Sequence, residues 1–244
     1  MPTELQSTEA LPLTPQAQRA LIQRLYGTAP RGTRLKQSWR PYLAPFAGAL
    51  QAVPQGSRVM DIGCGGGLFL LLLAAGDRIA AGFGFDRSRG DIRTAQQATQ
   101  NSGFSSVLRF EVRDLASGVP EEEWPVVSLI DVLHHVPKQQ HRSLVCSLSE
   151  RVALGGRLII REPARRPYWR NFANLMHDLI MARQIVHSRD PEEIEGWLAQ
   201  SGLRLIQKET TTALWYGHWL LVFERPYYEE TQAKPKRIAG IGRG

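Results

Sequence analysis

Residues 59–69 read VMDIGCGGGLF, and this stretch constrains the fold more than any other part of the chain. An apolar run broken by Asp61 leads into four glycines within residues 63–67, and a second apolar run begins at Leu68. Glycine adopts the positive φ angles of tight turns and leaves the backbone open to a ligand. The stretch therefore predicts a strand, a ligand-binding turn and a helix.

From residue 57 onward, short apolar runs alternate with segments of helical periodicity. The apolar runs are RVMDIG, IAAGFGFD, SVLRFEVRD, PVVSLIDVL and GRLIIRE, and the helical segments cover residues 67–75, 88–101 and 139–151. This alternation predicts βαβ units, and so an α/β, Rossmann-like, doubly wound sheet with helices on both faces. The later stretch SGLRLIQKETTTALWYGHWLLVFERP predicts an antiparallel pair that closes the sheet.

The remaining parts of the chain flank or interrupt this domain. Thr14 and Pro15 predict the start of a helix that runs to about Tyr26, followed by a basic loop over 27–42 and a short helix over 44–52. Between the fifth strand and the helix near Glu192, an apolar face at helical spacing predicts a helical insert, which either packs on the sheet or covers an acceptor. We expect a disordered N-terminus (1–13), a helical segment (14–56), the main domain (57–228) with its insert at about 163–190, and a basic tail (229–244).

The glycine turn has the wrong pattern for a nucleotide phosphate. Glycines 63, 65 and 67 form G-x-G-x-G rather than the G-x-G-x-x-G of dinucleotide folds, and no Gly-Lys-Ser/Thr follows. No Lys or Arg lies between Met60 and Gly76, and Asp61 would repel phosphate. An adenosyl ligand that carries a cationic sulfonium and an ammonium group suits these residues better.

Acidic residues follow the next strands at corresponding positions. Asp86 ends the second strand, where a carboxylate can accept hydrogen bonds from both ribose hydroxyls. Asp114 follows the third strand, where it can accept one from an adenine amino group, and DVLHHVP follows the fourth. The carboxyl ends of parallel strands share one edge of the sheet, which is where open α/β sheets bind ligands.

With VMDIGCGGG, GFGFDRS, VRDL, DVLHHVP and GGRLIIREP, the chain resembles class I S-adenosylmethionine-dependent methyltransferases over about residues 58–163 and the terminal hairpin. The resemblance implies a seven-stranded sheet with an antiparallel last strand, and S-adenosyl-L-methionine as cofactor. One departure is Trp124-Pro125, where many members carry an aromatic-Asp pair. The resemblance implies that Asp61, Gly63, Gly65 and Gly67 surround the methionine end, that Asp86 holds the ribose, and that Asp114 and Leu115 hold the adenine. Cys64, Arg87 and Asp131 are further candidate cofactor contacts, with small-residue packing or a reactive thiol as the alternatives for Cys64.

His134 and His135 are the candidate catalytic residues, because the transferred methyl group should lie just past the fourth strand. One of them either deprotonates a substrate hydroxyl or, alternatively, closes the cofactor pocket or caps the next helix. Methyl transfer is an in-line displacement that proximity can drive without a strong base. We expect no metal site, because no two histidines stand at i, i+4 and the two cysteines are isolated.

Charge leaves several partners open. The net charge of +7 and the pI of about 9.8 admit nucleic acid, an anionic membrane surface or an acidic protein, and equally a basic surface kept for solubility. Two cysteines, the absence of a signal-peptide pattern and a longest apolar run too short to cross a bilayer predict a cytoplasmic protein without a transmembrane segment.

We expect a methyltransferase acting on a small or lipid-like acceptor at a hydroxyl oxygen, with carbon and nitrogen acceptors still open. An Asn/Asp-Pro-Pro-Tyr motif would favour amino groups of nucleic acid or protein, but the sequence there reads DVLH. Nucleic acid is thus a disfavoured partner. The alternatives are an RNA or protein methyltransferase, an enzyme whose substrate sits on an acidic carrier protein, and a non-catalytic cofactor-binding scaffold.

Overall fold

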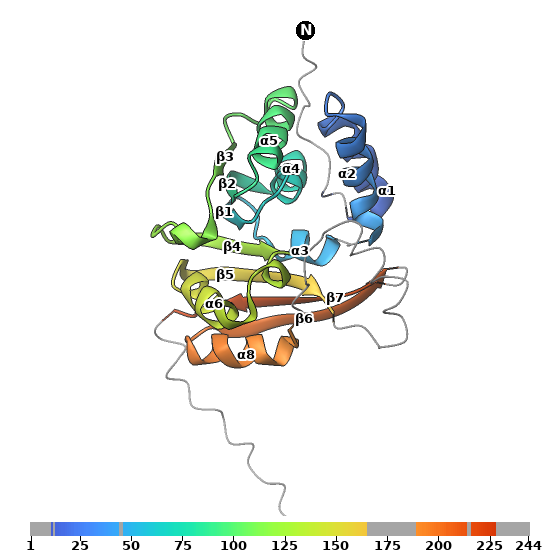
Figure 1. Ribbon diagram of the computed structural model, residues 1–244. Coiled ribbons are helices and arrows are strands. Elements are labelled where there is room, and N and C mark those ends of the chain that lie inside the picture. The colour runs from blue at the N-terminus through green and yellow to red at the C-terminus, as the bar shows by residue number, and fades with distance from the viewer. Residues whose placement is uncertain (1–10, 12, 44–45, 165–188, 214–215, 228–244) are drawn as a thin grey trace, which may run out of the picture.

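The computed structural model describes residues 11, 13–43, 46–164, 189–213 and 216–227 (Figure 1). Nearly all of the predicted disordered N-terminus, most of the helical insert and the whole basic tail lie outside these residues. The insert's basic and aromatic residues (Arg165, Arg166, Tyr168, Trp169, Arg170) and its apolar face (Phe172, Leu175, Met176, Leu179, Val186) also lie outside them.

Seven strands form one sheet in the order β3-β2-β1-β4-β5-β7-β6. All neighbours pair in parallel except β7, which is antiparallel to both β5 and β6. The predicted α/β sheet with an antiparallel last strand is confirmed. The strands are β1 (Ser57–Ile62), β2 (Ile79–Asp86), β3 (Leu108–Val112), β4 (Trp124–Ile130), β5 (Val152–Pro163), β6 (Arg204–Ala213) and β7 (Tyr216–Glu224).

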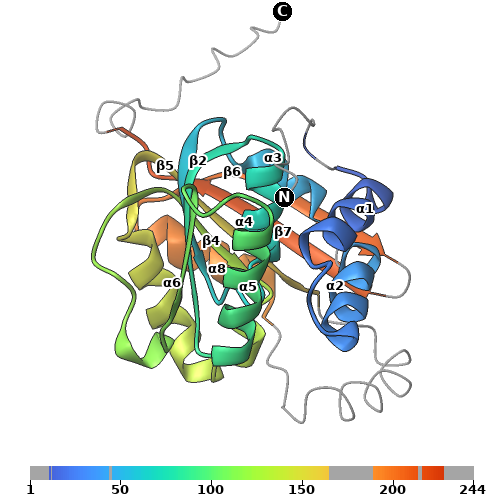
Figure 2. The same ribbon diagram turned by 90° about the horizontal axis from the view of Figure 1, so that it is seen from above.

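Helices cover both faces of this sheet, as Figures 1 and 2 show. One face carries α3 (Ala47–Ala52), α4 (Leu68–Ala75) and α5 (Arg89–Asn101), and the other carries α6 (His141–Ser149) and α8 (Pro191–Gln200). Two buried apolar clusters lie between these layers, one on each face. Seven of the eight residues of α4 are buried, because this helix lies between the sheet and the N-terminal helices, which explains why it is apolar all round.

The N-terminal helices confirm one prediction and correct another. Thr14 caps α1 (Pro15–Leu25) as expected, since its hydroxyl accepts a hydrogen bond from the Ala17 N–H at 3.2 Å. The predicted basic loop over 27–42 is wrong from Arg31 onward, because α2 (Arg31–Leu43) is a helix. Two features obscure this helix in the sequence: Pro41 lies inside it, and it buries the polar Gln37 and Ser38 while it exposes Leu35 and Trp39.

The topology places the carboxyl ends of β1, β2, β3 and β4 at one edge of the sheet. The chain moves outward from β1 to β2 and β3 in one direction and from β4 to β5 in the other, so the order reverses between β1 and β4. Such a reversal leaves a crevice at the carboxyl ends of the strands. Among the described residues, no helix is long and apolar enough to cross a membrane.

Candidate functional site

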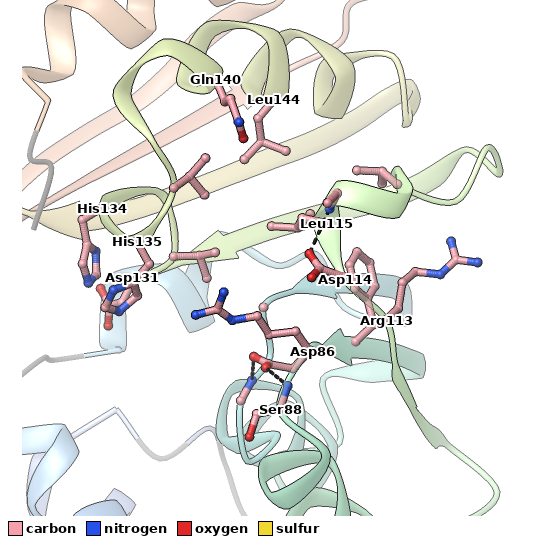
Figure 3. A pocket seen from close by; sticks show the side chains of 18 of the residues that line it. Asp86, Ser88, Arg113, Asp114, Leu115, Asp131, His134, His135, Gln140 and Leu144 are labelled. Atoms are coloured by element: carbon pink, nitrogen blue, oxygen red, sulfur yellow. Dashed lines mark hydrogen bonds between the residues drawn. The ribbon is translucent and has the colours of Figure 1, made fainter. Parts of the chain in front are cut away.

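A cavity of about 850 Å³ lies at the carboxyl ends of the strands (Figure 3). Its walls come from the glycine turn, the segments after β2, β3 and β4, and helices α2 and α6. Nine of the sequence-predicted site residues line it, whereas Asp61, Cys64 and Gly67 do not. The nine are Gly63, Gly65, Asp86, Arg87, Asp114, Leu115, Asp131, His134 and His135.

The three alternate glycines of the turn serve different purposes. All have positive φ, but a Cβ on Gly65 would meet nothing within 4 Å, so this residue keeps the cavity wall open. A Cβ on Gly67 would lie 2.7 Å from the Phe110 ring, and one on Gly63 would lie 2.5 Å from a methyl of Val132. Gly67 is therefore required for packing of α4. Cys64 is buried beside Gly84, and burial raises the pKa of its thiol, so packing explains this residue.

Asp86 is held rigidly at the end of β2. Its two carboxylate oxygens accept hydrogen bonds from the Gly65 N–H at 3.0 Å and the Ser88 N–H at 2.8 Å. Each oxygen keeps a further lone pair, and the side chain lines the cavity (Figure 3). A fixed, bidentate acceptor next to an open glycine wall fits the adjacent hydroxyls of a ribose.

The segment after β3 forms an apolar wall with one acid. Asp114 caps the short 3-10 helix η1 (Leu115–Ser117) by accepting from the Ala116 N–H at 3.0 Å. It therefore has the capping role that any Asp after a strand can have, while its carboxylate also lines the cavity. Leu115, Val119 and Leu144 add apolar surface, which suits a flat aromatic ring such as adenine.

Asp61 is buried below the turn, away from the large cavity. It lines a small neighbouring cavity together with Arg40 and Phe46, and it accepts a hydrogen bond from the Ser128 hydroxyl at 2.7 Å. Burial raises the pKa of Asp61 to about 7, although the Ser128 hydrogen bond opposes the shift. Near neutral pH this carboxyl is therefore partly protonated, and a cation that binds beside it would favour its ionised form.

Two arginine side chains surround Asp131, which has an unusual φ of +57°. The Arg161 guanidinium donates to both carboxylate oxygens, and Arg40 Nη2 lies 3.6 Å from Oδ2. Both guanidinium groups also stack over Phe46. Burial alone would raise the pKa of Asp131, but Arg161 and Arg40 outweigh it and hold the pKa at about 2. Asp131 is thus a permanent anion that positions two arginines.

Glu162 organises the segment after β4. Its Oε1 accepts from the Val132 and Leu133 N–H groups at 2.8 and 2.6 Å, which holds the start of η2 (Leu133–His135). Its Oε2 accepts from the His134 backbone at 3.2 Å and lies 2.6 Å from His134 Nδ1. Burial would lower the pKa of His134, but the hydrogen bond and charge of Glu162 outweigh burial and raise it.

His135 lies beside this pair in a different electrostatic state. The two imidazole rings have centroids 4.0 Å apart (Figure 3). Burial, His134 and Arg87 together lower the pKa of His135 to about 4, so its ring is neutral at pH 7. Of the two histidines, His134 alone has a carboxylate partner among the described residues.

Sequence reasoning missed the residues that hold these groups in place. Arg40 stands in the segment predicted to be a loop, while Arg161 and Glu162 belong to a strand whose apolar pattern says nothing of their contacts. Tyr26 donates to the Gly66 carbonyl at 2.7 Å and so ties the N-terminal helices to the glycine turn. The available signal was a basic residue followed directly by an acidic one, Arg161 and Glu162, in a buried strand.

Comparisons with known proteins identify the family of this chain. Residues 31–208 match the methyltransferase domain family. Over 155 residues the chain is 30% identical to the ubiquinone biosynthesis O-methyltransferase of Pseudomonas fluorescens (strain SBW25), covering 61% of this chain and 65% of that protein. The chain thus spans slightly less than two thirds of the length of this curated relative.

Two solved structures share the fold. An O-methyltransferase family protein from Burkholderia thailandensis matches with a TM-score of 0.61 and 18% identity over 92% of this chain and 66% of that chain. The magnesium protoporphyrin IX methyltransferase of Synechocystis PCC 6803, solved with bound SAH, matches with a TM-score of 0.59 and 22% identity. The match covers 84% of this chain and 93% of that chain. Because the family match covers most of the chain and agrees with the sheet order, this chain belongs to the class I S-adenosylmethionine-dependent methyltransferases.

Proposed function

We propose that this chain methylates a hydroxyl oxygen of a small or lipid-like acceptor. The observation that carries the proposal is the arrangement of the cavity. Asp86, Asp114 and Leu115 lie at one side of it, and the His134 imidazole, hydrogen-bonded to Glu162, lies at the other. The name of the Pseudomonas relative, an O-methyltransferase, supports oxygen as the acceptor atom.

The residues present fit S-adenosylmethionine, which when bound supplies an electrophilic methyl group. Asp86 would hold the ribose, and Asp114 and Leu115 would hold the adenine. Gly65 would leave room for the part of the cofactor that links the adenosine to the methionine. Arg40 lines both the large and the small cavity, so its guanidinium would face the carboxylate of the methionine part of the cofactor. Asp61, which lines the small cavity, would face the ammonium group.

His134 is the residue best suited to remove the hydroxyl proton. Because Nδ1 is engaged by Glu162, the remaining acceptor on the ring is Nε2. Glu162 fixes the ring and raises its pKa, so the imidazole is a stronger base than a free histidine. His134 Nε2 would take the hydroxyl proton as the acceptor oxygen receives the methyl group that S-adenosylmethionine would supply, with S-adenosylhomocysteine as the leaving group.

A binding measurement tests the cofactor part of this proposal. In Asp86→Ala the ribose loses its charged acceptor, so affinity for S-adenosylhomocysteine should fall by about 2–3 kcal/mol in calorimetry. Glu150→Gln, an exposed change outside the cavity, serves as the control. Unchanged affinity in Asp86→Ala would remove this residue from the site, and tighter binding of NAD would refute the cofactor.

An activity measurement tests the acceptor separately. The chain should transfer radiolabelled methyl from S-adenosylmethionine to phenols that carry apolar chains, giving a methyl ether identified by mass spectrometry. Transfer only to amines, or only to a substrate tethered to an acidic carrier protein, would refute the free hydroxyl acceptor while leaving the cofactor assignment intact.

A further inference from the structure

Helix α2 exposes apolar side chains and buries polar ones, which is the reverse of an ordinary surface helix. Leu35 and Trp39 are 62% and 47% exposed, whereas Gln37 and Ser38 are only 2% and 8% exposed. Leu35 and Trp39 stand four residues apart and therefore share one side of the helix. Helix α1 packs against α2, whereas the outward apolar side of α2 stays largely exposed among the described residues.

The same region carries the whole net charge of the chain. Residues 10–60 contain seven of the 30 lysines and arginines and none of the 23 aspartates and glutamates, so the rest of the chain, with 23 of each sign, is neutral. The exposed Arg31 and Arg34 lie on α2 close to Leu35. The apolar side of α2 therefore lies within a stretch of sequence that carries seven positive charges and no negative one.

The exposed tryptophan is held in position. The Arg19 guanidinium of α1 lies 5.5 Å from the centroid of the Trp39 ring and 6.0 Å from that of Tyr42. Trp39 and Tyr42 also contact each other, with centroids 5.9 Å apart. Ordering the ring in advance lowers the entropic cost of docking it on a partner.

Together, these observations lead us to propose that α2 docks on the surface of an anionic lipid membrane. Leu35 and Trp39 enter the boundary between headgroups and acyl chains, and Arg31 and Arg34 contact lipid phosphates. A membrane offers negative charge directly above hydrocarbon, which matches cations beside apolar side chains. RNA would match the arginines and stack on Trp39, but it offers no apolar layer for Leu35.

Docking in this way would bring the cavity near the lipid surface. Arg40, on the same helix, lines the cavity, so α2 forms part of its wall. Binding to vesicles needs no turnover, so the proposal does not depend on which acceptor the cavity takes.

Co-sedimentation with vesicles tests the proposal on the full chain. We expect binding to vesicles of equal parts phosphatidylcholine and phosphatidylglycerol, little binding to phosphatidylcholine alone, and weaker binding as salt rises. Leu35→Gln with Trp39→Gln should weaken binding at least tenfold. Arg31→Gln with Arg34→Gln should also weaken it about tenfold or more, because each arginine near an anionic surface adds to affinity.

Matched changes elsewhere control for surface polarity and net charge. Leu154→Gln with Ile206→Gln alters two exposed apolar residues of β5 and β6. Lys138→Gln with Arg142→Gln removes two charges beside and on α6, on the other face of the sheet. Both control pairs should bind vesicles within about twofold of the unchanged chain, and circular dichroism should show that all variants fold.

Four results would overturn the proposal. These are equal binding to both kinds of vesicle, the same loss in test and control pairs, and binding to single-stranded RNA but not to vesicles. The fourth is a dimer that Leu35→Gln with Trp39→Gln dissociates in sedimentation velocity without any vesicle binding, which would make this face a contact between copies of the chain.

Discussion

At the scale of single residues, the site separates a group with fixed charge from groups whose pKa the fold raises. Asp131 is an anion throughout the physiological range, since Arg161 and Arg40 hold its pKa at about 2. Asp61 and His134 are different, because burial or a carboxylate partner moves each pKa upward. The fixed charges hold the backbone in place, whereas the groups with raised pKa values can gain or lose a proton when cofactor or acceptor binds.

Replacing His134 by Gln should lower turnover about 10²–10⁴-fold with nearly unchanged affinity for S-adenosylhomocysteine, if His134 removes the hydroxyl proton. His135→Gln should have a smaller effect. Turnover of the unchanged chain should rise with pH up to the raised pKa of His134. Glu162→Gln should move that rise to lower pH, because Glu162 raises this pKa. Loss of cofactor binding in His134→Gln would support a pocket-closing role instead.

Replacing Asp61 by Asn should stabilise the ligand-free chain at alkaline pH. The folded-state pKa of about 7 exceeds the model-peptide value of 3.8, so Asp61 favours folding fully below pH 3.8 and loses that contribution as pH rises through 7. Asn does not titrate, so its advantage should grow across this window to at most about 4 kcal/mol. Urea unfolding at pH 4, 6 and 8 measures it, and a pH-independent difference would contradict the prediction.

At the scale of elements, the glycine turn combines two tasks that the sequence motif does not distinguish. Gly65 opens the wall of the cavity, whereas Gly67 lets α4 begin against Phe110 and Ala95. The G-x-G-x-G pattern predicted a ligand-binding turn, but only the structure shows that Gly65 borders the cavity and that Gly67 is needed for packing.

Gly65→Ala and Gly67→Ala should therefore fail in different ways. A Cβ at Gly65 projects into open space, so the change should cost only about 1–2 kcal/mol of backbone strain but weaken S-adenosylhomocysteine binding at least tenfold. A Cβ at Gly67 would overlap Phe110, so stability should fall by about 2–4 kcal/mol. Urea unfolding and calorimetry separate the two effects, and parallel losses in both variants would refute the division of roles.

Most elements could be predicted from the sequence, and the exceptions have a physical cause. The strands and α4–α6 follow from apolar runs, and Asp86 follows from its place after β2. Helix α2 could not be predicted, because its apolar residues Leu35 and Trp39 point outward and Gln37 and Ser38 point inward. Glu162 was missed for another reason: its partners lie 28–30 residues away in the sequence.

At the scale of the whole molecule, the cavity exists only where the two halves of the sheet meet. The glycine turn and Asp86 come from the half that contains β1–β3, while His134 and Glu162 come from the half that contains β4–β7. A ligand that spans the cavity would therefore contact both halves and stabilise them together.

S-adenosylhomocysteine at 100 times its dissociation constant should add about 2.7 kcal/mol to the free energy of unfolding. For a chain of this size, that corresponds to a rise of roughly 5–10 °C in the melting temperature. Differential scanning calorimetry measures the shift. NAD at the same concentration serves as the control and should give no rise, and equal shifts with both ligands would contradict the cofactor.

Adjacent residues on β5 hold the loop after β4 from opposite sides of the sheet, because Arg161 contacts Asp131 on one face and Glu162 contacts residues 132–134 on the other. A strand alternates its side chains, so neither contact can form until β5 has paired with β4 in the correct register. The loop should therefore become ordered late in folding. In pulsed hydrogen exchange during refolding, the Val132 and Leu133 amides should gain protection after those of β1 and β4, which makes this loop a reporter for the completed sheet.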